Sequence, residues 1–113
     1  MAYFNRKTVC NNGHSHPSAK EARRCNDLHV MQRAGLIAGL RYEPRFHFHV
    51  NGREVKMRNG QVASYRPDFT YIASGKQIAE EVKAKNGYVQ EASALRMALF
   101  RACYPDIELR VVA

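Results

Sequence analysis

The chain has 113 residues, 45% hydrophobic and 25% charged, which fits one folded domain over residues 1–113 and excludes a disordered tail. No apolar run approaches the about 20 residues of a membrane helix, and no signal-peptide core is present near the N-terminus, so we expect a cytoplasmic protein with no membrane partner. The net charge of +8 comes entirely from residues 1–67, which favours a nucleic-acid partner over a merely solubilising surface.

An irregular N-terminal segment, residues 1–16, is expected to precede a first helix. Ser18 stands three residues before Glu21, which is the spacing of a capping box, and it follows Pro17, which suits the start of a helix. Apolar residues then recur at helical spacing as far as Gly35, a natural end for the helix. Residues 36, 37 and 40 lead into the next element.

A change to a period of two at residue 45 predicts a β-meander. Asn51-Gly52 is a strong hairpin signal, and Asn59-Gly60 is expected to form a second turn of the same kind. A third strand then runs through residues 62–71, and Ser74-Gly75 marks the turn to a fourth strand over residues 77–84. The first strand has an apolar face and a basic face, formed respectively by Phe46, Phe48 and Val50 and by Arg45, His47 and His49.

A second helix is predicted over residues 88–103, after a break at Lys85-Asn86-Gly87. Tyr104-Pro105 ends this helix, and residues 107–112 form a short final strand. The order of helix, meander, helix and strand predicts an α/β or α+β fold, with a mixed central sheet flanked by two helices. The stripe expected to be buried on the second helix consists of Ala92, Leu95, Leu99 and Ala102.

The hairpin at Ser74-Gly75 brings two carboxylates together. If the hairpin is centred between these two residues, Asp68 pairs with Glu81, and directly opposed residues share a face of the sheet. Lys83 lies two residues beyond Glu81 and therefore on the same face, whereas Glu80 points to the other face. The sequence thus predicts that Asp68, Glu81 and Lys83 converge.

Two opposed carboxylates repel each other, so we expect a compensating cation. A hard divalent ion such as Mg²⁺ takes oxygen ligands from carboxylates and leaves room for water and a phosphate oxygen. Pro67 cannot donate to the ladder, so the pairing is expected to loosen beside Asp68, where a metal needs access. Lys83 is placed to orient a metal-bound water or to stabilise developing charge.

These residues resemble a known nuclease motif. Pro67-Asp68, twelve intervening residues and then Glu81-Val82-Lys83 are similar to the PD-(D/E)XK motif. The resemblance narrows to small phage-encoded proteins described as Holliday-junction-resolvase-like and classified as a domain of unknown function. It extends over about residues 13–112, and Ala84 departs from it, because the family often has glycine after the lysine. The supporting segments are residues 18–23, 35–37, 65–69 and 80–83.

The resemblance implies a restriction-endonuclease-like core with the order αβββαβ and a metal-dependent DNA endonuclease that leaves a 5′-phosphate. It implies Mg²⁺ or Mn²⁺ bound by Asp68, Glu81 and the Val82 carbonyl, with Lys83 catalytic and Glu21 reaching in from the first helix. Because the chain shows no recognition helix for the major groove, we expect structure-selective cutting of branched DNA or nonspecific nicking. Paired nicks would call for a homodimer, and a phage origin would place the protein in the bacterial host's cytoplasm.

Several basic residues are candidates for contacts with the DNA backbone: Arg45, His47, His49, Arg66, Lys85 and Arg96. For Arg96 and for the strand face of residues 45, 47 and 49, a purely solvent-exposed surface is an equal alternative. Tyr88 is expected to pack on the core, although it could stack on a base.

Two other functions remain open at the level of sequence. One is a catalytically inactive nucleic-acid-binding domain with the same fold. The other is a zinc-stabilised phage interaction protein, because Cys10, His14, His16 and Cys25 are all zinc-binding residue types. Their spacing matches no strong zinc pattern, and Cys25 shares a helix face with apolar residues, so we expect it to lie in the core and zinc to be absent.

Overall fold

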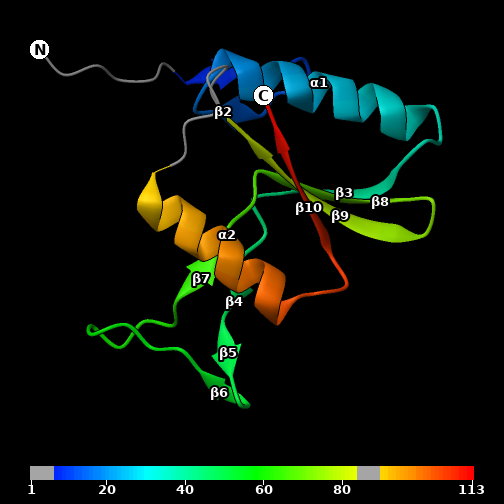
Figure 1. Ribbon diagram of the computed structural model, residues 1–113. Helices are drawn as coiled ribbons and strands as arrows, with labels where there is room; N and C mark the ends of the chain where they lie inside the picture. The colour runs from blue at the N-terminus through cyan, green and yellow to red at the C-terminus, as the bar shows by residue number, and fades with distance from the viewer. Residues whose placement is uncertain (1–6, 84–89) are drawn as a thin grey trace, which may run out of the picture.

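The computed structural model describes residues 7–83 and 90–113 of the chain. Figure 1 shows two helices and a central sheet, with a strand-containing arm extending away from them. In the described residues no helix combines the length and the apolar character needed to cross a membrane. The elements in chain order are β1 (Thr8–Val9), β2 (Ser15–His16), α1 (Ala19–Arg33), β3 (Ala38–Tyr42), β4 (Phe46–His47), β5 (His49–Val50), β6 (Arg53–Glu54), β7 (Ser64–Tyr65), β8 (Phe69–Ala73), β9 (Lys76–Val82), α2 (Glu91–Cys103) and β10 (Glu108–Val112).

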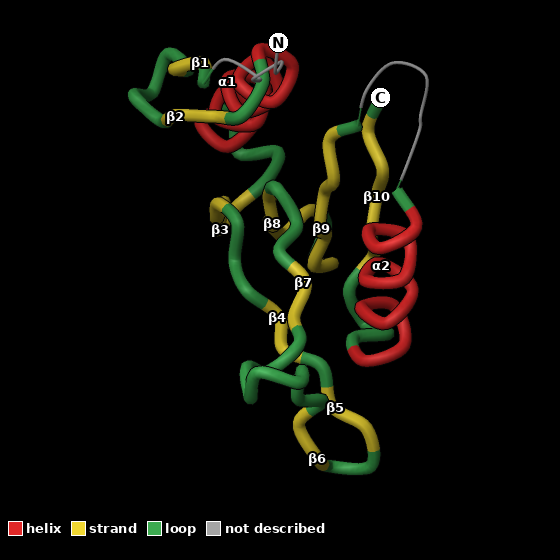
Figure 2. The backbone as a smooth tube through the Cα atoms, turned by 90° about the vertical axis from the view of Figure 1, so that its left-hand side faces the viewer, coloured by secondary structure: helices red, strands yellow, loops and turns green. Residues whose placement is uncertain are grey.

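The central sheet has four strands in the order β10-β9-β8-β3. β8 is antiparallel to both of its neighbours, whereas β10 runs parallel to β9, so the sheet is mixed, as predicted, in an α+β fold. The helices lie on opposite sides of this sheet (Figure 2). Successive residues of β9 serve the two sides, since Ile78 packs in the core beneath α1 and Ala79 in the core beneath α2.

Helix α1 begins and ends where the sequence predicts. The Ser18 hydroxyl accepts the Glu21 backbone N–H at 3.1 Å, and Gly35 adopts a φ of +79°, which favours glycine. The Leu36 N–H then donates to the Met31 carbonyl at 2.9 Å and closes the C-terminal end. The face that α1 buries includes Cys25 and Leu28, both fully shielded from solvent.

The first strands of the predicted meander do not join the central sheet, which corrects the expected topology. β4 pairs with β7 and β5 with β6, which makes an arm of residues 45–65 that extends below the sheet in Figure 1. The place at the sheet edge belongs to β3, a strand that the sequence did not indicate. The β3–β8 register shifts between Ala38 and Arg41, with Gly39 at a φ of +64°, so no period of two is visible there.

The sidedness of the arm is predicted correctly except at its tip. Phe48 is buried, and Phe46 packs edge-on against the Phe100 ring at 5.1 Å, while Arg45 and the two histidines are exposed. Val50, which was expected on the apolar side, is 54% exposed, because the arm has run past the core by that point.

Two of the three predicted turns have the expected conformation. Both residues of Asn51-Gly52 and both of Ser74-Gly75 have positive φ, as tight two-residue hairpins require. The turn at Asn59-Gly60 is of a different kind. Only Gly60 has positive φ there, and the Met57 N–H donates to the Gln61 carbonyl at 2.7 Å, which gives a longer loop.

Helix α2 is present, but the stripe predicted to be buried is wrong. Met97 and Phe100 face the sheet, whereas Leu95 is 61% exposed, Ala92 and Ala102 are exposed and Leu99 is only partly buried. With 3.6 residues per turn, Met97 and Phe100 lie nearly opposite the predicted stripe, and both faces carry apolar side chains, so periodicity alone could not choose between them. Lys85 and Tyr88, along with the predicted break and the start of this helix, lie outside the described residues.

Candidate functional site

The β8–β9 register agrees with the prediction from the hairpin. Thr70 pairs with Ala79 and Ile72 with Gln77, which sets Asp68 opposite the end of β9. Regular pairing stops there, because Pro67 separates β7 from β8. Asp68 is held instead by two hydrogen bonds: its N–H donates to the Glu80 carbonyl at 2.9 Å, and its Oδ2 accepts the Val82 N–H at 2.7 Å.

Three carboxyl groups meet at this point, with Asp68 in the middle. Burial raises the pKa of Asp68 to about 7, helped by a side-chain hydrogen bond with Glu21 that favours the protonated form. Burial likewise raises the pKa of Glu21 and that of Glu81, and for Glu81 the neighbouring Asp68 charge adds to it. The cluster therefore resists carrying its full negative charge unless a cation is present.

Lys83 and Tyr65 complete the cluster around Glu81. The Lys83 Nζ lies 3.6 Å from Glu81 Oε2, and both side chains are largely shielded, at 18% and 14% exposure. The Tyr65 hydroxyl donates to Glu81 Oε1, and burial together with this carboxylate raises the pKa of the tyrosine. Sequence reasoning missed Tyr65, because the break at Pro67 interrupts the register through which strand residues could be aligned.

Glu80 lies on the other face of the sheet, as predicted, and has a structural partner there. The Arg24 guanidinium donates to both of its carboxylate oxygens, at 2.8 Å and 2.7 Å, and the Tyr71 hydroxyl also donates to it. Glu80 is fully buried, so this bidentate contact fixes α1 to the sheet. Nothing in the sequence pattern indicated that Arg24 would be its partner.

Glu21 joins the carboxylates from α1. The predicted capping box forms only in part: Ser18 caps the Glu21 N–H, but the Glu21 carboxylate turns to His16, whose Nδ1 lies 2.7 Å from Oε2, and to Asp68. Glu21 is only 5% exposed, so it acts inside the molecule and not at the helix end.

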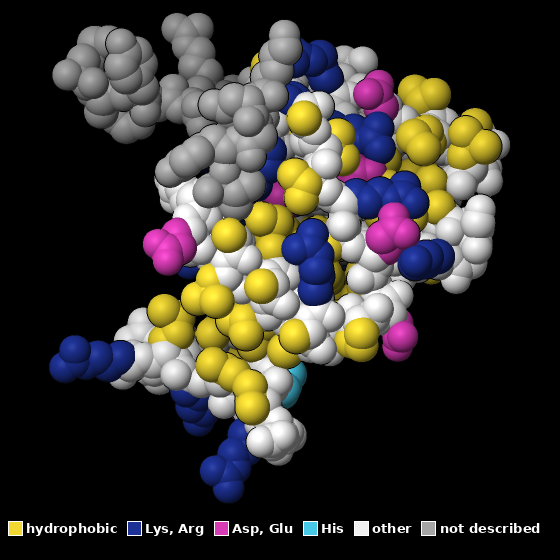
Figure 3. Space-filling view, viewed as in Figure 1, with side chains coloured by type: hydrophobic (Ala, Val, Ile, Leu, Met, Phe, Trp, Pro, Cys, Tyr) yellow, Lys and Arg dark blue, Asp and Glu magenta, His cyan; other side chains and the backbone are white. Residues whose placement is uncertain are grey.

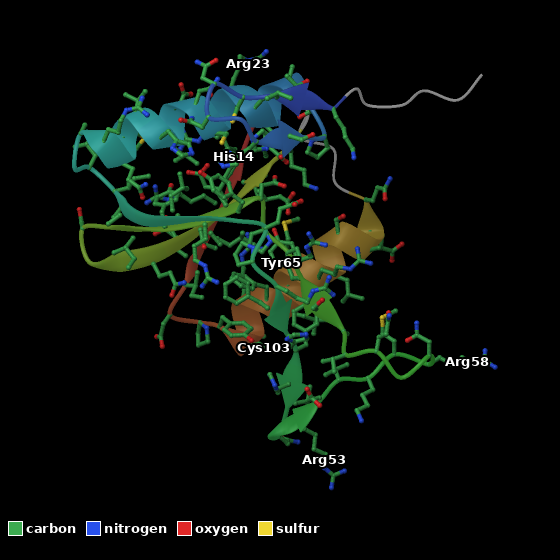
Figure 4. The ribbon with its side chains drawn as sticks, turned by 180° about the vertical axis from the view of Figure 1, so that it is seen from behind. His14, Arg23, Arg53, Arg58, Tyr65 and Cys103 are labelled. Atoms are coloured by element: carbon green, nitrogen blue, oxygen red, sulfur yellow. The ribbon has the colours of Figure 1, made fainter. Side chains whose placement is uncertain are left out.

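Two pockets border the carboxylates. The first, of about 300 Å³, places Glu81 and Lys83 next to two arginines from different elements, Arg66 before β8 and Arg96 on α2. The second, of about 360 Å³, is lined by Glu21 and Asp68 and by residues of the N-terminal hairpin. Tyr65, the last residue of β7, packs its ring 5.2 Å from that of Phe100 on α2 and lines the first pocket (Figure 4).

The other candidate DNA contacts are more dispersed. Arg45 lies in a neighbouring apolar groove, with its Nη1 3.5 Å from the Ser64 hydroxyl, while His47 and His49 are exposed on the arm. Arg53 and Arg58, which were not predicted as contacts, extend from the ends of the arm (Figure 4). Figure 3 shows Lys and Arg side chains projecting from this lower part of the molecule. Lys85 lies outside the described residues.

A second cluster of polar side chains lies between the β1–β2 hairpin and α1, where Figure 4 shows His14. The His14 Nδ1 is 3.5 Å from Cys10 Sγ and 3.7 Å from Cys25 Sγ. Burial favours the neutral thiol of Cys10, but hydrogen bonds with the backbone of Asn12 and His14 outweigh it and bring its pKa to about 7. Burial and the neighbouring Cys10 raise the pKa of Cys25 to about 12.

Comparison with known proteins identifies a family and no individual relative. Neither the curated proteins nor the solved structures contain a significant match to this chain. One family model matches, and it extends over residues 1–113, the whole sequence. The chain therefore belongs to the family described as "Protein of unknown function (DUF1064)".

Proposed function

We propose that this protein is a metal-dependent DNA endonuclease of the PD-(D/E)XK type, with a restriction-endonuclease-like core, that cuts branched DNA or nicks DNA nonspecifically. The observation that carries the proposal is the convergence of Asp68, Glu81 and Lys83 at an interrupted end of the sheet, beside a pocket with two arginines. An aspartate and a glutamate held together beside a half-buried lysine are a costly arrangement for a surface that has no chemical role.

The donor set fits Mg²⁺ or Mn²⁺. Asp68 and Glu81 offer hard carboxylate oxygens, and because burial raises the pKa of each, a bound cation would stabilise their charged forms. The Val82 N–H points to Asp68, and in an extended strand the carbonyl of the same residue points to the same side, which makes it a third oxygen ligand. Glu21 would be a fourth, directly or through water. When bound, the ion would activate a water molecule and neutralise charge on the scissile phosphate.

The side chains of the chain itself supply positioning. Lys83, held beside Glu81, is placed to orient the attacking water and to stabilise the negative charge that develops on the oxygens of the scissile phosphate. Tyr65 fixes the rotamer of Glu81 through its hydrogen bond. Arg66 and Arg96 border the same pocket, where each could hold a backbone phosphate next to the one that is cut.

The test is nicking of supercoiled plasmid with Mg²⁺ present. We expect Asp68→Asn and Lys83→Ala to lower the rate about 100-fold or more, while DNA binding in a gel-shift assay is retained. Matched controls are Asp106→Asn, in an exposed turn, and Lys76→Ala, at the opposite end of β9, where the lysine pairs with Glu108.

The outcome separates the enzyme from a DNA-binding domain that has lost activity. Wild-type protein that binds plasmid but nicks it no faster than the Asp68→Asn variant would identify the binding domain. For the proposed homodimer, sedimentation at several protein concentrations gives the mass directly.

A further inference from the structure

We propose that Cys10, His14, His16 and Cys25 form a structural zinc site that fastens the N-terminal hairpin to helix α1. The site is separate from the proposed magnesium site and would exist whether or not the protein is a nuclease. It reverses the expectation from the sequence, in which the irregular spacing of these residues argued against zinc and Cys25 was assigned to the core alone.

The distances between the four side chains fit a tetrahedral site. One ligand atom from each of the four residues lies within 4.8 Å of the other three. Zinc bound at about 2.3 Å to sulfur and about 2.0–2.1 Å to nitrogen gives edges of about 3.5–3.6 Å between sulfur and nitrogen. The two distances from His14 Nδ1, 3.5 Å to Cys10 Sγ and 3.7 Å to Cys25 Sγ, match these edges.

His16 provides a second, independent observation. Its side chain is 5% exposed, and its Nε2 is the one buried side-chain nitrogen or oxygen atom in the described part of the chain that has no hydrogen-bond partner. The other ring nitrogen, Nδ1, faces the Glu21 carboxylate at 2.7 Å. The carboxylate accepts a hydrogen bond from Nδ1–H, so Nε2 carries the lone pair, and this arrangement of carboxylate, histidine and metal recurs in zinc proteins.

The local fold explains why a metal is useful at this place. β1 and β2 have only two residues each, and a two-stranded hairpin is marginal even when it is longer. Cys10, His14 and His16 all come from this hairpin, whereas Cys25 lies nearly two turns into α1. Four protein ligands leave no open position, which is typical of structural zinc, and the metal would join the hairpin to the helix.

The zinc site would also act on Glu21. Because His16 is held by zinc on one nitrogen and faces Glu21 with the other, the metal fixes the direction in which the Glu21 carboxylate enters the carboxylate cluster. Glu21 in turn orients the His16 ring for zinc through this hydrogen bond, in addition to its proposed role as a magnesium ligand.

The experiment measures metal content and spectrum, with no DNA present. Protein is expressed with zinc in the medium, carries no histidine tag and is purified without chelator. We expect one zinc per chain in wild type and in Cys103→Ser, which removes the one cysteine outside the cluster. Cys25→Ser should lose most of the zinc, and zinc affinity in Glu21→Ala should fall about 10-fold to 100-fold.

Cobalt substitution keeps the test decisive if Cys25→Ser does not fold. Wild-type protein exchanged with Co²⁺ should show the visible bands of a tetrahedral cobalt ion and a thiolate-to-cobalt charge-transfer band. The proposal would be overturned if wild-type protein purified without zinc and also showed no such bands after addition of Co²⁺. A disulfide between Cys10 and Cys25, found by mass spectrometry, would overturn it as well. Neither result would bear on the nuclease, whose test is nicking by Asp68 variants.

Discussion

Several interactions from different elements converge on Asp68. It ends the regular pairing of β8, accepts a backbone N–H from β9, and touches carboxyl groups from α1 and β9. The register of the hairpin located Glu81 correctly. It could not show that Glu21 would approach from the helix, which only the family resemblance implied. The consequence is a carboxyl group whose proton affinity depends on the ions around it.

The pH dependence of stability should reveal this group. In folded protein the pKa of Asp68 is about 7, against an ordinary value of 3.8, so the folded state holds the extra proton. The resulting stabilisation is complete below about pH 4 and is lost as the pH rises through 7. Between pH 5.5 and pH 8, the free energy of unfolding of wild type without magnesium should fall by about 2 kcal/mol more than that of Asp68→Asn.

Urea denaturation at the two pH values measures this difference. The groups that face Asp68 are Glu21 from α1, Glu81 from β9, Lys83 directly after β9 and Glu43 from the loop after β3, and all remain in the variant. Equal falls in wild type and variant would mean that Asp68 does not titrate in this range.

Among the elements, those marked by local signals were predicted well and those set by packing were not. Ser18 and Gly35 bound α1 correctly, and the turn residues located the hairpins, because caps and positive φ are properties of one or two residues. β3 was not predicted because the bulge at Gly39 interrupts the alternation of apolar and polar residues that marks a strand. The buried face of α2 was misplaced because the choice depends on rings contributed by distant strands.

Two substitutions on α2 test which face is buried. Phe100 is fully buried against Phe46 and Tyr65, so Phe100→Ala should lower the free energy of unfolding by about 3–5 kcal/mol. Leu95 is 61% exposed, so Leu95→Ala should change it by about 0.5 kcal/mol or less. Chemical denaturation gives both values. If Leu95→Ala lowered the free energy of unfolding more than Phe100→Ala does, the buried face would be the one expected from the sequence.

On the scale of the whole molecule, the structure shows where part of the excess positive charge lies. Part of the excess of basic residues in the first 67 positions lies on the arm, whose ends carry Arg53 and Arg58 far from the carboxylates (Figure 4). An extended basic arm beside a pocket with two arginines would follow a DNA backbone over a longer path than the pocket alone. From the sequence, the strands of the arm were expected in the central sheet, which the structure corrects, whereas DNA as the partner stays a prediction.

Salt dependence tests the role of the arm. If Arg53 and Arg58 each neutralise a phosphate, the double variant to glutamine should reduce the slope of log affinity against log salt concentration by about 0.9 per lost contact. Arg23→Gln is the matched control, since this arginine is exposed on α1 and points away from the arm (Figure 4). Fluorescence anisotropy with labelled duplex measures the slopes; equal slopes for all three proteins would remove the arm from the DNA path.

The central claim is that the carboxylate cluster around Asp68 hydrolyses DNA with a divalent metal. The measurement that tests it most directly is cleavage at fixed salt of end-labelled linear, nicked, flapped and four-way-branched DNA, with Mg²⁺ or with chelator. We expect cuts that leave 5′-phosphates, depend on Mg²⁺ and disappear in Asp68→Asn. Cleavage of the same substrates at wild-type rates by Asp68→Asn, or equally in chelator, would contradict the claim.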